Sequence, residues 1–180
     1  VRIPLGPDLS NPVPVFATNL PLTLESNDEN NTPEKAQSVT LPTGINGRIN
    51  SENDVDCFKF EAKKGEKFTF EVRARRYQSA MDPYIRILND KGAVVTENDD
   101  LRDGKRGSAD SRIDNWAVPA DGTYVLEIRD MHLRGSDSCV YFIEATKAVP
   151  HFRLYADTDK TLLGPGGLGV LFVNVSIGGT

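Results

Sequence analysis

The sequence lacks most of the residues from which enzymes build imidazole or thiolate sites. Its 180 residues include only two histidines, His132 and His151, and two cysteines, and these do not follow the ligand spacings of a zinc site. There is no Gly-x-Ser-x-Gly elbow, no His-Glu-x-x-His pair and no glycine-rich phosphate loop. We therefore expect no catalytic activity, and a hydrolase is the least favoured function class.

Long hydrophobic runs and local concentrations of positive charge are also lacking. No stretch approaches the roughly 18 consecutive apolar residues that cross a bilayer, and no charged-then-apolar signal segment opens the chain. Aspartate and glutamate (26) outnumber lysine and arginine (21), so the formal net charge is −5. We expect neither membrane insertion nor nucleic-acid binding.

The two cysteines, Cys57 and Cys139, are too few for a disulfide framework and fit a reducing or an oxidising compartment equally well. They could pair, because the first and last strands of a sandwich are often neighbours. They could equally stay free, because Cys57 has the opposite parity to Phe58 whereas Cys139 shares the parity of Tyr141. The sequence leaves both alternatives open.

What the sequence does contain is a two-residue alternation of apolar and polar side chains. The clearest examples are residues 67–75, 123–130 and 139–145. Weaker runs, separated by turn signals, lie at residues 44–49, 57–62, 83–88, 93–97, 112–118, 151–156 and 170–176. Short strands with one apolar face each predict an all-β fold, an antiparallel β-sandwich or barrel. One helical turn is expected near Pro33, with Thr32 as its cap.

Proline-rich and glycine-rich joints divide the chain into three parts. We expect residues 1–20 to be a leader or the end of a preceding domain, and residues 21–148 to form the main sandwich. Residues 149–180 have the pattern of the opening strands of a following domain. Because the chain begins with Val1 and stops within a strand-like pattern, we expect it to be part of a longer protein.

Oxygen-bearing side chains gather in two acidic segments. The first contains Glu25, Asn27 and Asp28, and the second follows at residues 51–56, with Asp54 and Asp56. A calcium ion takes six to eight oxygen ligands, which neither segment supplies alone but both together could supply. The alternative is that water alone solvates these side chains.

A third acidic group gives a weaker indication of a metal site. It includes Asp99, Asp100 and Asp110, but its order does not fit the register of an EF-hand loop. Acidic loops are also common because they remain solvated. Whether these residues form a second site is left open.

Two aromatic residues are candidates for ligand binding. Trp116 either packs in the core, if Ile113 and Val118 lie on either side of an irregularity, or forms a platform on which a sugar or peptide stacks. Tyr77 lies beside two arginines, Arg75 and Arg76, and could join a polar binding groove.

Five segments, taken in order, resemble the bacterial pre-peptidase C-terminal domain family. They are LESNDENNTPEKAQSV, GRINSENDVDCFKFEAKKGEKFTFEV, RRYQSAMDPYIRILNDKGAVVTENDD, ADSRIDNWAVPADGTYVLEIRD and YFIEA. The family pattern includes Glu-Pro-Asn-Asp, Asp-Val-Asp before alternating aromatics, Asn-Asp-Asp and Asp-Gly-x-Tyr. The resemblance covers about residues 21–148, and the order and spacing of the motifs carry it.

The resemblance implies a β-sandwich of jelly-roll type without catalytic activity, attached to a secreted or cell-surface bacterial protein. It implies an immunoglobulin-like segment at residues 149–180. Relatives in secreted collagenases bind collagen and calcium, and the implied calcium ligands here are Glu25, Asn27, Asp28, Asp54 and Asp56. Ser26 replaces the usual proline, and Thr23 stands where collagen binders often carry an acid, so one ligand could be missing.

The sequence thus predicts a calcium-stabilised accessory module that acts as a spacer or a substrate-targeting unit. Its expected partners are adjacent domains of the same polypeptide and an extracellular protein or polysaccharide polymer. The alternative is an adhesive module whose main task is to bind a carbohydrate or protein polymer.

Overall fold

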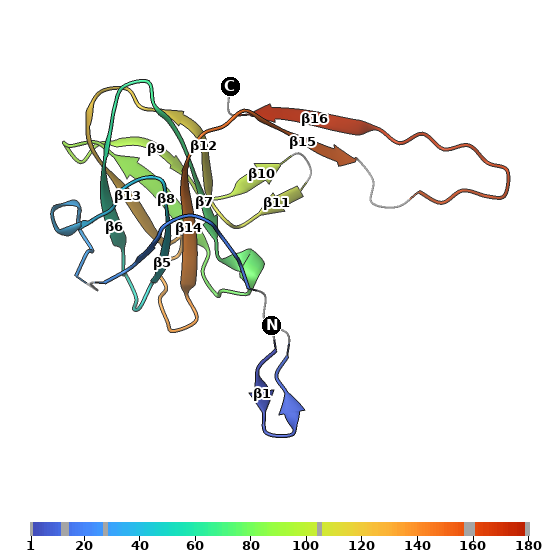
Figure 1. The fold of residues 1–180 in the computed structure, drawn as a ribbon, viewed down its shortest axis with the longest axis horizontal. Coiled ribbons are helices and arrows are strands. Elements are labelled where there is room, and N and C mark those ends of the chain that lie inside the picture. The colour runs from blue at the N-terminus through green and yellow to red at the C-terminus, as the bar shows by residue number, and fades with distance from the viewer. Residues whose placement is uncertain (1, 12–14, 27–28, 104–105, 157–160, 179–180) are drawn as a thin grey trace.

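Apolar side chains at alternate positions build two five-stranded sheets that pack face to face (Figure 1). The computed structural model describes residues 2–11, 15–26, 29–103, 106–156 and 161–178. The predicted β-sandwich is confirmed, while its jelly-roll path stays a prediction.

The first sheet has the strand order β12-β7-β14-β5-β3. Its strands are β12 (Arg112–Ala117), β7 (Lys67–Arg73), β14 (Val140–Lys147), β5 (Thr43–Arg48) and β3 (Leu22–Leu24). All neighbours pair antiparallel except β3, which runs parallel to β5.

The second sheet has the order β4-β6-β13-β8-β9. Its strands are β4 (Gln37–Ser38), β6 (Asp56–Ala62), β13 (Gly122–Asp130), β8 (Pro83–Leu88) and β9 (Val94–Asn98). Here β4 is parallel to β6 and the other pairs are antiparallel. Both sheets are therefore mixed, which corrects the purely antiparallel expectation: the N-terminal segment adds a short parallel strand to one edge of each sheet.

Between the sheets lies one hydrophobic core, filled by the side chains that the alternation places on the inner faces. Its largest fully buried apolar side chains are Phe58, Phe70, Ile45, Ile49, Met81, Ile85, Ile87, Leu126, Ile128, Ile143 and Val72. The inward faces predicted for the three clearest runs are confirmed.

Trp116 packs against this core. The pairing of β12 with β7 shifts register between Ile113 and Trp116, and this irregularity turns the indole inward. Its ring lies 5.1 Å from that of Tyr124, 6.4 Å from Phe70 and 6.5 Å from Phe60. The structure thus decides between the two alternatives for Trp116 in favour of core packing.

In the part of the chain that the structure describes, two short 3-10 helices interrupt the strands. η1 (Pro33–Lys35) has Pro33 in its first turn as predicted, although the side chain of Thr32 makes no capping hydrogen bond. η2 (Arg75–Tyr77) was not expected, because the apolar alternation of β7 continues through Ala74 in the sequence.

Cys57 and Cys139 are both buried and free. Cys57 belongs to a small satellite cluster with Ala36, Leu88 and Val125, whereas Cys139 belongs to the main core. Their side chains therefore lie in separate clusters, as their opposite parity indicated, and no disulfide joins them.

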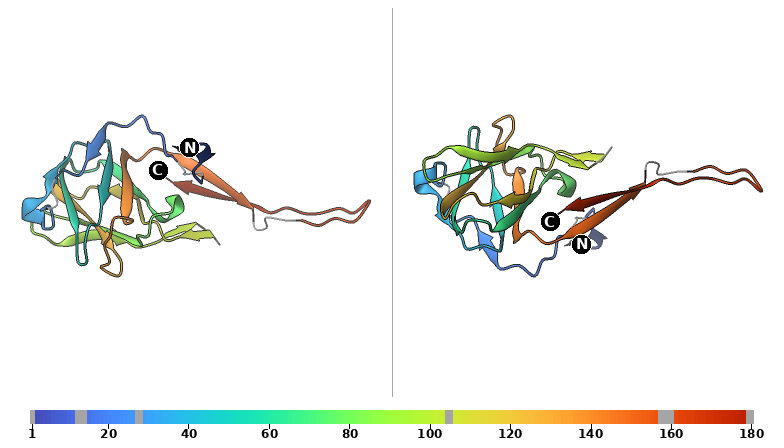
Figure 2. Two further views of the ribbon diagram at one scale, coloured as in Figure 1. Left: turned by 90° about the horizontal axis from the view of Figure 1, so that it is seen from below. Right: turned by 90° about the horizontal axis from the view of Figure 1, so that it is seen from above.

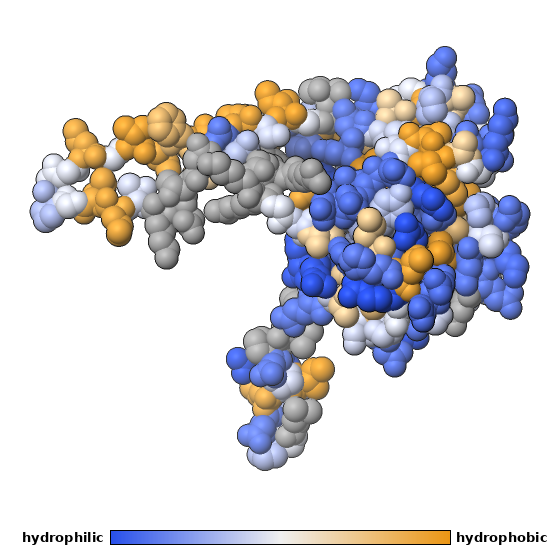
Figure 3. All heavy atoms as spheres, turned by 180° about the vertical axis from the view of Figure 1, so that it is seen from behind, coloured by the Kyte–Doolittle hydropathy of each residue, from blue (hydrophilic) through white to orange (hydrophobic). Residues whose placement is uncertain are grey.

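Among the described residues, three hairpins lie outside the sandwich. They are formed by β1 (Pro4–Leu5) with β2 (Asp8–Leu9), β10 (Leu101–Asp103) with β11 (Arg106–Ser108), and β15 (His151–Ala156) with β16 (Val173–Gly178). The β15–β16 hairpin extends away from the sandwich (Figure 2). One of its faces is apolar and more than half exposed, as the hydrophobic residues along this arm show (Figure 3): Phe152, Leu154, Val173, Val175 and Ile177.

The Phe70→Ala substitution is expected to lower the free energy of unfolding by about 3–5 kcal/mol, because it opens a cavity at a fully buried position. Leu24→Ala is the matched control, since Leu24 is 67% exposed on an edge strand, and its effect should stay within about 0.5 kcal/mol. Urea denaturation measures both. Equal losses in the two variants would contradict the core assignment.

Candidate functional site

The candidate site lies where β6 begins, beside β14. Asp56, the first residue of β6, is fully buried, and its Oδ2 accepts a hydrogen bond of 2.7 Å from the hydroxyl of Tyr141. The tyrosine is also buried, at 3% exposure. The alternation predicted that Tyr141 points inward, but it did not say which group its hydroxyl would meet.

Glu25 brings a second carboxylate to this place from the end of β3. Its backbone N–H donates to the carbonyl of Asn46 at 2.8 Å, and its Oε2 accepts from the backbone N–H of Arg48 at 2.9 Å. The other oxygen, Oε1, is buried and receives no hydrogen bond from the described residues. A buried carboxylate oxygen without a donor is costly, so this atom needs a partner, which a protonated carboxyl group or a cation would supply.

Gly47 makes this approach possible. A Cβ at position 47 would collide with the hydroxyl of Tyr141 and would lie 2.8 Å from Oε2 of Glu25. Any other residue would therefore push the carboxylate or the tyrosine out of place.

Asp54 adds a third carboxyl group nearby. It is buried at 6% exposure, and its Oδ2 accepts a hydrogen bond of 2.6 Å from the backbone N–H of Asn50. This bond closes the turn that precedes β6. The turn contains Asn53 with a positive φ of 63°, a conformation that asparagine tolerates better than most residues.

These surroundings raise the pKa of Asp56 to about 9. Burial is the largest cause, followed by the hydrogen bond and the negative charge of Glu25, with a smaller contribution from Asp54. The hydrogen bond from Tyr141 acts in the opposite direction but does not compensate. At neutral pH Asp56 therefore holds a proton, unless a cation replaces it.

The structure brings together three of the five predicted metal ligands, Glu25, Asp54 and Asp56, while Asn27 and Asp28 lie outside the described residues. Among the residues that the structure describes, no three His, Cys, Asp or Glu side chains are arranged to hold a metal ion. A metal here would therefore need further oxygen ligands. No specific signal in the sequence pointed to Tyr141, beyond the rule that a buried tyrosine hydroxyl needs a partner.

Asp110 of the third acidic group has a structural role. Its Oδ1 accepts hydrogen bonds from the backbone N–H groups of Ala74 and Arg75, at 3.1 and 2.6 Å. Its Oδ2 accepts one of 2.5 Å from Nε of Arg76. The carboxylate thus holds the start of η2, and these contacts account for its burial.

Other acids of the sandwich are paired with arginines. On the outer face of the first sheet, Glu71 accepts a hydrogen bond from Arg112 at 3.1 Å, and Glu144 accepts one from Arg73 at 2.8 Å. Although burial opposes it, the hydrogen bond from Arg76 and the nearby positive charges lower the pKa of Glu71. Arginines thus compensate the negative charges of Glu71 and Glu144, and this distinguishes the two glutamates from Glu25 and Asp56.

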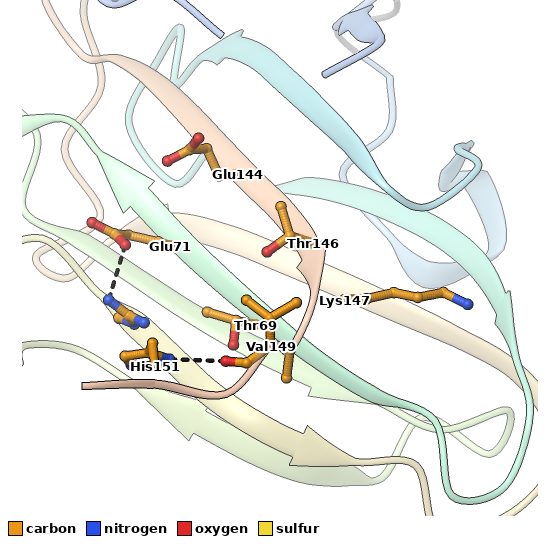
Figure 4. Close-up of a pocket in the computed structure, with 9 residues that line it drawn as sticks. Thr69, Glu71, Glu144, Thr146, Lys147, Val149 and His151 are labelled. Atoms are coloured by element: carbon orange, nitrogen blue, oxygen red, sulfur yellow. Dashed lines mark hydrogen bonds and ion pairs between the residues drawn. The ribbon is translucent and has the colours of Figure 1, made fainter. Parts of the chain in front are cut away.

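The same glutamates line a hollow of about 130 Å³ where the chain leaves β14 (Figure 4). His151 lies at its rim and its Nδ1 is 3.0 Å from the carbonyl oxygen of Val149. A few water molecules would fill this space, and its acids are already paired. We therefore regard the hollow as a joint between the sandwich and the C-terminal hairpin.

Within the described part of the chain, none of the helices has the length and apolar character that spanning a bilayer requires.

In the metal-free protein, stability is expected to fall as the pH rises from about 4 to about 9. The folded-state pKa of Asp56 lies above the unfolded value of about 3.9, so in this window the folded chain holds a proton that the unfolded chain has released. The Asp56→Asn substitution removes the group that binds this proton and should therefore make stability less dependent on pH. Thermal midpoints measured in a chelator across this pH range give the comparison, and parallel curves for the two proteins would contradict the carboxyl pair.

No family model and no curated protein match the sequence. Among solved structures, the chain is similar to the pre-peptidase C-terminal domain of a collagenase from Bacillus anthracis. The two are 17% identical with a TM-score of 0.44, and the match covers 65% of this chain and 98% of that one. This domain belongs to the family that the sequence motifs resemble.

The chain is also similar to PliG, a periplasmic inhibitor of g-type lysozyme from Aeromonas hydrophila. The identity is 14% and the TM-score 0.39, with coverage of 62% of this chain and 97% of that one. Both likenesses are too distant to support an inference of function, which therefore has to come from the residues of this chain.

Proposed function

We propose that the chain is a non-catalytic accessory module of an exported bacterial protein, and that calcium fastens its N-terminal segment to the sandwich. The observation that carries the proposal is the contact between the carboxylate of Glu25, whose Oε1 has no donor among the described residues, and the buried carboxyl group of Asp56. A buried aspartate beside a half-buried glutamate is unfavourable when both are ionised, and a divalent cation would compensate both.

Calcium suits the chemistry of this donor set. Glu25, Asp54 and Asp56 offer carboxylate oxygens, and Asn27 and Asp28 would complete the set together with backbone carbonyls or water. Calcium prefers oxygen ligands and tolerates irregular geometry, whereas zinc and the softer metals favour histidine and cysteine. Bound calcium would supply positive charge to the acid pair, and its role would be structural.

A clasp at this position would fix the way the preceding chain leaves the module. Glu25 follows β3 and Asp56 opens β6, so the two ligands lie 31 positions apart in the sequence and on different sheets. A cross-link of this length removes conformational entropy from the unfolded chain and from the joint. A defined joint is what a spacer between domains requires.

The second candidate function is adhesion to an extracellular polymer, and the groove beside Tyr77 favours it. Tyr77 lines a hollow on the outer face of the first sheet together with Phe16 and Phe142. Trp116, the residue best suited to stack on a sugar, packs against the core instead. A protein polymer is therefore favoured over a polysaccharide.

Calcium is expected to raise the melting temperature by about 5–10 °C over that in a chelator. The range follows from about 2.7 kcal/mol of stabilisation at one hundred times the dissociation constant, and from a shift of about 2–4 °C per kcal/mol for a chain of this size. Differential scanning calorimetry with millimolar calcium and with EGTA measures it.

Asp56→Asn should lose most of this shift, because it removes a proposed ligand. Glu52→Gln is the matched control, since Glu52 is an exposed acid in the turn before β6, and it should keep the shift. Identical wild-type melting curves with calcium and with EGTA would refute the clasp.

A further inference from the structure

The outer face of the first sheet carries an aromatic pocket that the calcium proposal does not use. It is lined by Tyr77, Phe142 and Arg73, together with Asn46, Ser79 and Val140. The pocket already holds an aromatic side chain of this chain, that of Phe16. Phe16 comes from the strap, which we define as residues 15–20.

Phe16 is held from three directions. Its ring lies 5.2 Å from the ring of Phe142 and, edge to face, 6.1 Å from that of Tyr77. The guanidinium of Arg73 lies over the same ring at 4.4 Å from its centroid. A cation over the negative face of an aromatic ring is an attractive arrangement, so the pocket is complementary in charge as well as in shape to an aromatic side chain.

The strap lies on the sheet like a bound peptide. Its residues alternate between exposed and half-buried, with Phe16, Thr18 and Leu20 on the half-buried side. Peptides that bind in extended form use this same alternation, with every second side chain in a pocket.

The backbone of the strap is only weakly attached. In the described structure no backbone hydrogen bond joins residues 15–19 to the sheet, and the first such bond runs from the N–H of Gly44 to the carbonyl of Pro21 at 2.8 Å. Phe16 is thus the main anchor of this segment, and a segment held by one side chain can be displaced without unfolding the sandwich.

Phe16 does not fill the pocket completely. A hollow of about 290 Å³ remains between Phe16, Tyr77, Val140 and Phe142. This volume is at the lower end for ligand pockets, and it suits one or two side chains rather than a large cofactor. Arg73 is already paired with Glu144, so the site has no strong demand for an anionic ligand.

We propose that this pocket recognises an aromatic side chain in an extended segment of a partner protein, and that Phe16 occupies it in cis as a displaceable plug. The partner segment replaces the strap and places its own ring between Tyr77 and Phe142, under Arg73. This inference names the partner class for the adhesive role and does not depend on calcium. The plug competes with the partner. The apparent affinity for the partner therefore equals the affinity of the open pocket multiplied by the fraction of chains in which the pocket is open.

The test uses the full chain and a peptide with the sequence of the strap, Val-Phe-Ala-Thr-Asn-Leu, blocked at both ends. Peptide is titrated into 15N-labelled wild type and into the Phe16→Ala variant, with calcium and separately with EGTA. In the variant we expect saturable shifts of the amide signals of Ala74, Tyr77 and Phe142. The dissociation constant should be at least ten-fold lower than for the wild type, because the pocket is no longer plugged.

Matched controls make the result specific. Val15→Ala changes a strap residue that is 66% exposed and should bind the peptide as the wild type does. Adding Tyr77→Ala to Phe16→Ala should abolish binding, as should replacing phenylalanine by alanine in the peptide. Unchanged melting temperatures would show that the variants remain folded.

Equal affinities of wild type and Phe16→Ala, or equal binding of the alanine peptide, would overturn the proposal. A concentration-dependent wild-type dimer that Phe16→Ala abolishes would also overturn it, by assigning the pocket to a second copy of this chain. Binding that is the same with calcium and with EGTA supports the pocket even where the calcium clasp fails. If the peptide binds with calcium but not with EGTA, the statement that the pocket acts independently of calcium would be overturned.

Discussion

The buried carboxyl group of Asp56, beside the half-buried Glu25, needs a proton or a counter-charge, and this requirement acts where the N-terminal segment joins the sandwich. Elsewhere the same fold solves this problem with arginine, as at Glu71 and Glu144, which lie beside three guanidinium groups. At Glu25 and Asp56 the neighbours are a tyrosine hydroxyl and a backbone N–H instead. A hydroxyl and an amide orient carboxylates but do not neutralise them, so this pair depends on a proton or on a cation.

Much of the fold could be predicted because the core strands follow a local rule. Alternation located every long strand, and the turn residues located their ends. The parallel edge strands β3 and β4 were not found, because two or three residues are too few to show a period and their pairing is decided by distant strands. η2 was missed for a related reason: the apolar alternation of β7 continues up to Ala74, directly before η2, and Asp110, far along the chain, holds the backbone N–H groups there.

The candidate site was only partly predictable. Acidic composition and the family resemblance pointed to Glu25 and Asp56, but the approach of these residues depends on long-range pairing. Tyr141 lies 85 positions beyond Asp56, and Gly47 leaves the space in which their groups meet. Nothing in the sequence indicated a role for Phe16, because a single aromatic residue in a proline-rich segment belongs to no periodic pattern. Its role follows only from the sheet that it contacts.

The N-terminal segment is attached by two interactions of different kinds, and the strand between them keeps them independent. Phe16 is held by ring contacts on the outer face, whereas Glu25 is held by hydrogen bonds at the end of β3. Between them, β3 pairs with β5, and Thr23 and Thr43 join their hydroxyls at 3.0 Å. Releasing the ring of Phe16 therefore leaves β3 and Glu25 in place, so the outer pocket can open while the carboxyl pair stays closed. A module built in this way can keep a fixed joint and still offer a surface to a partner.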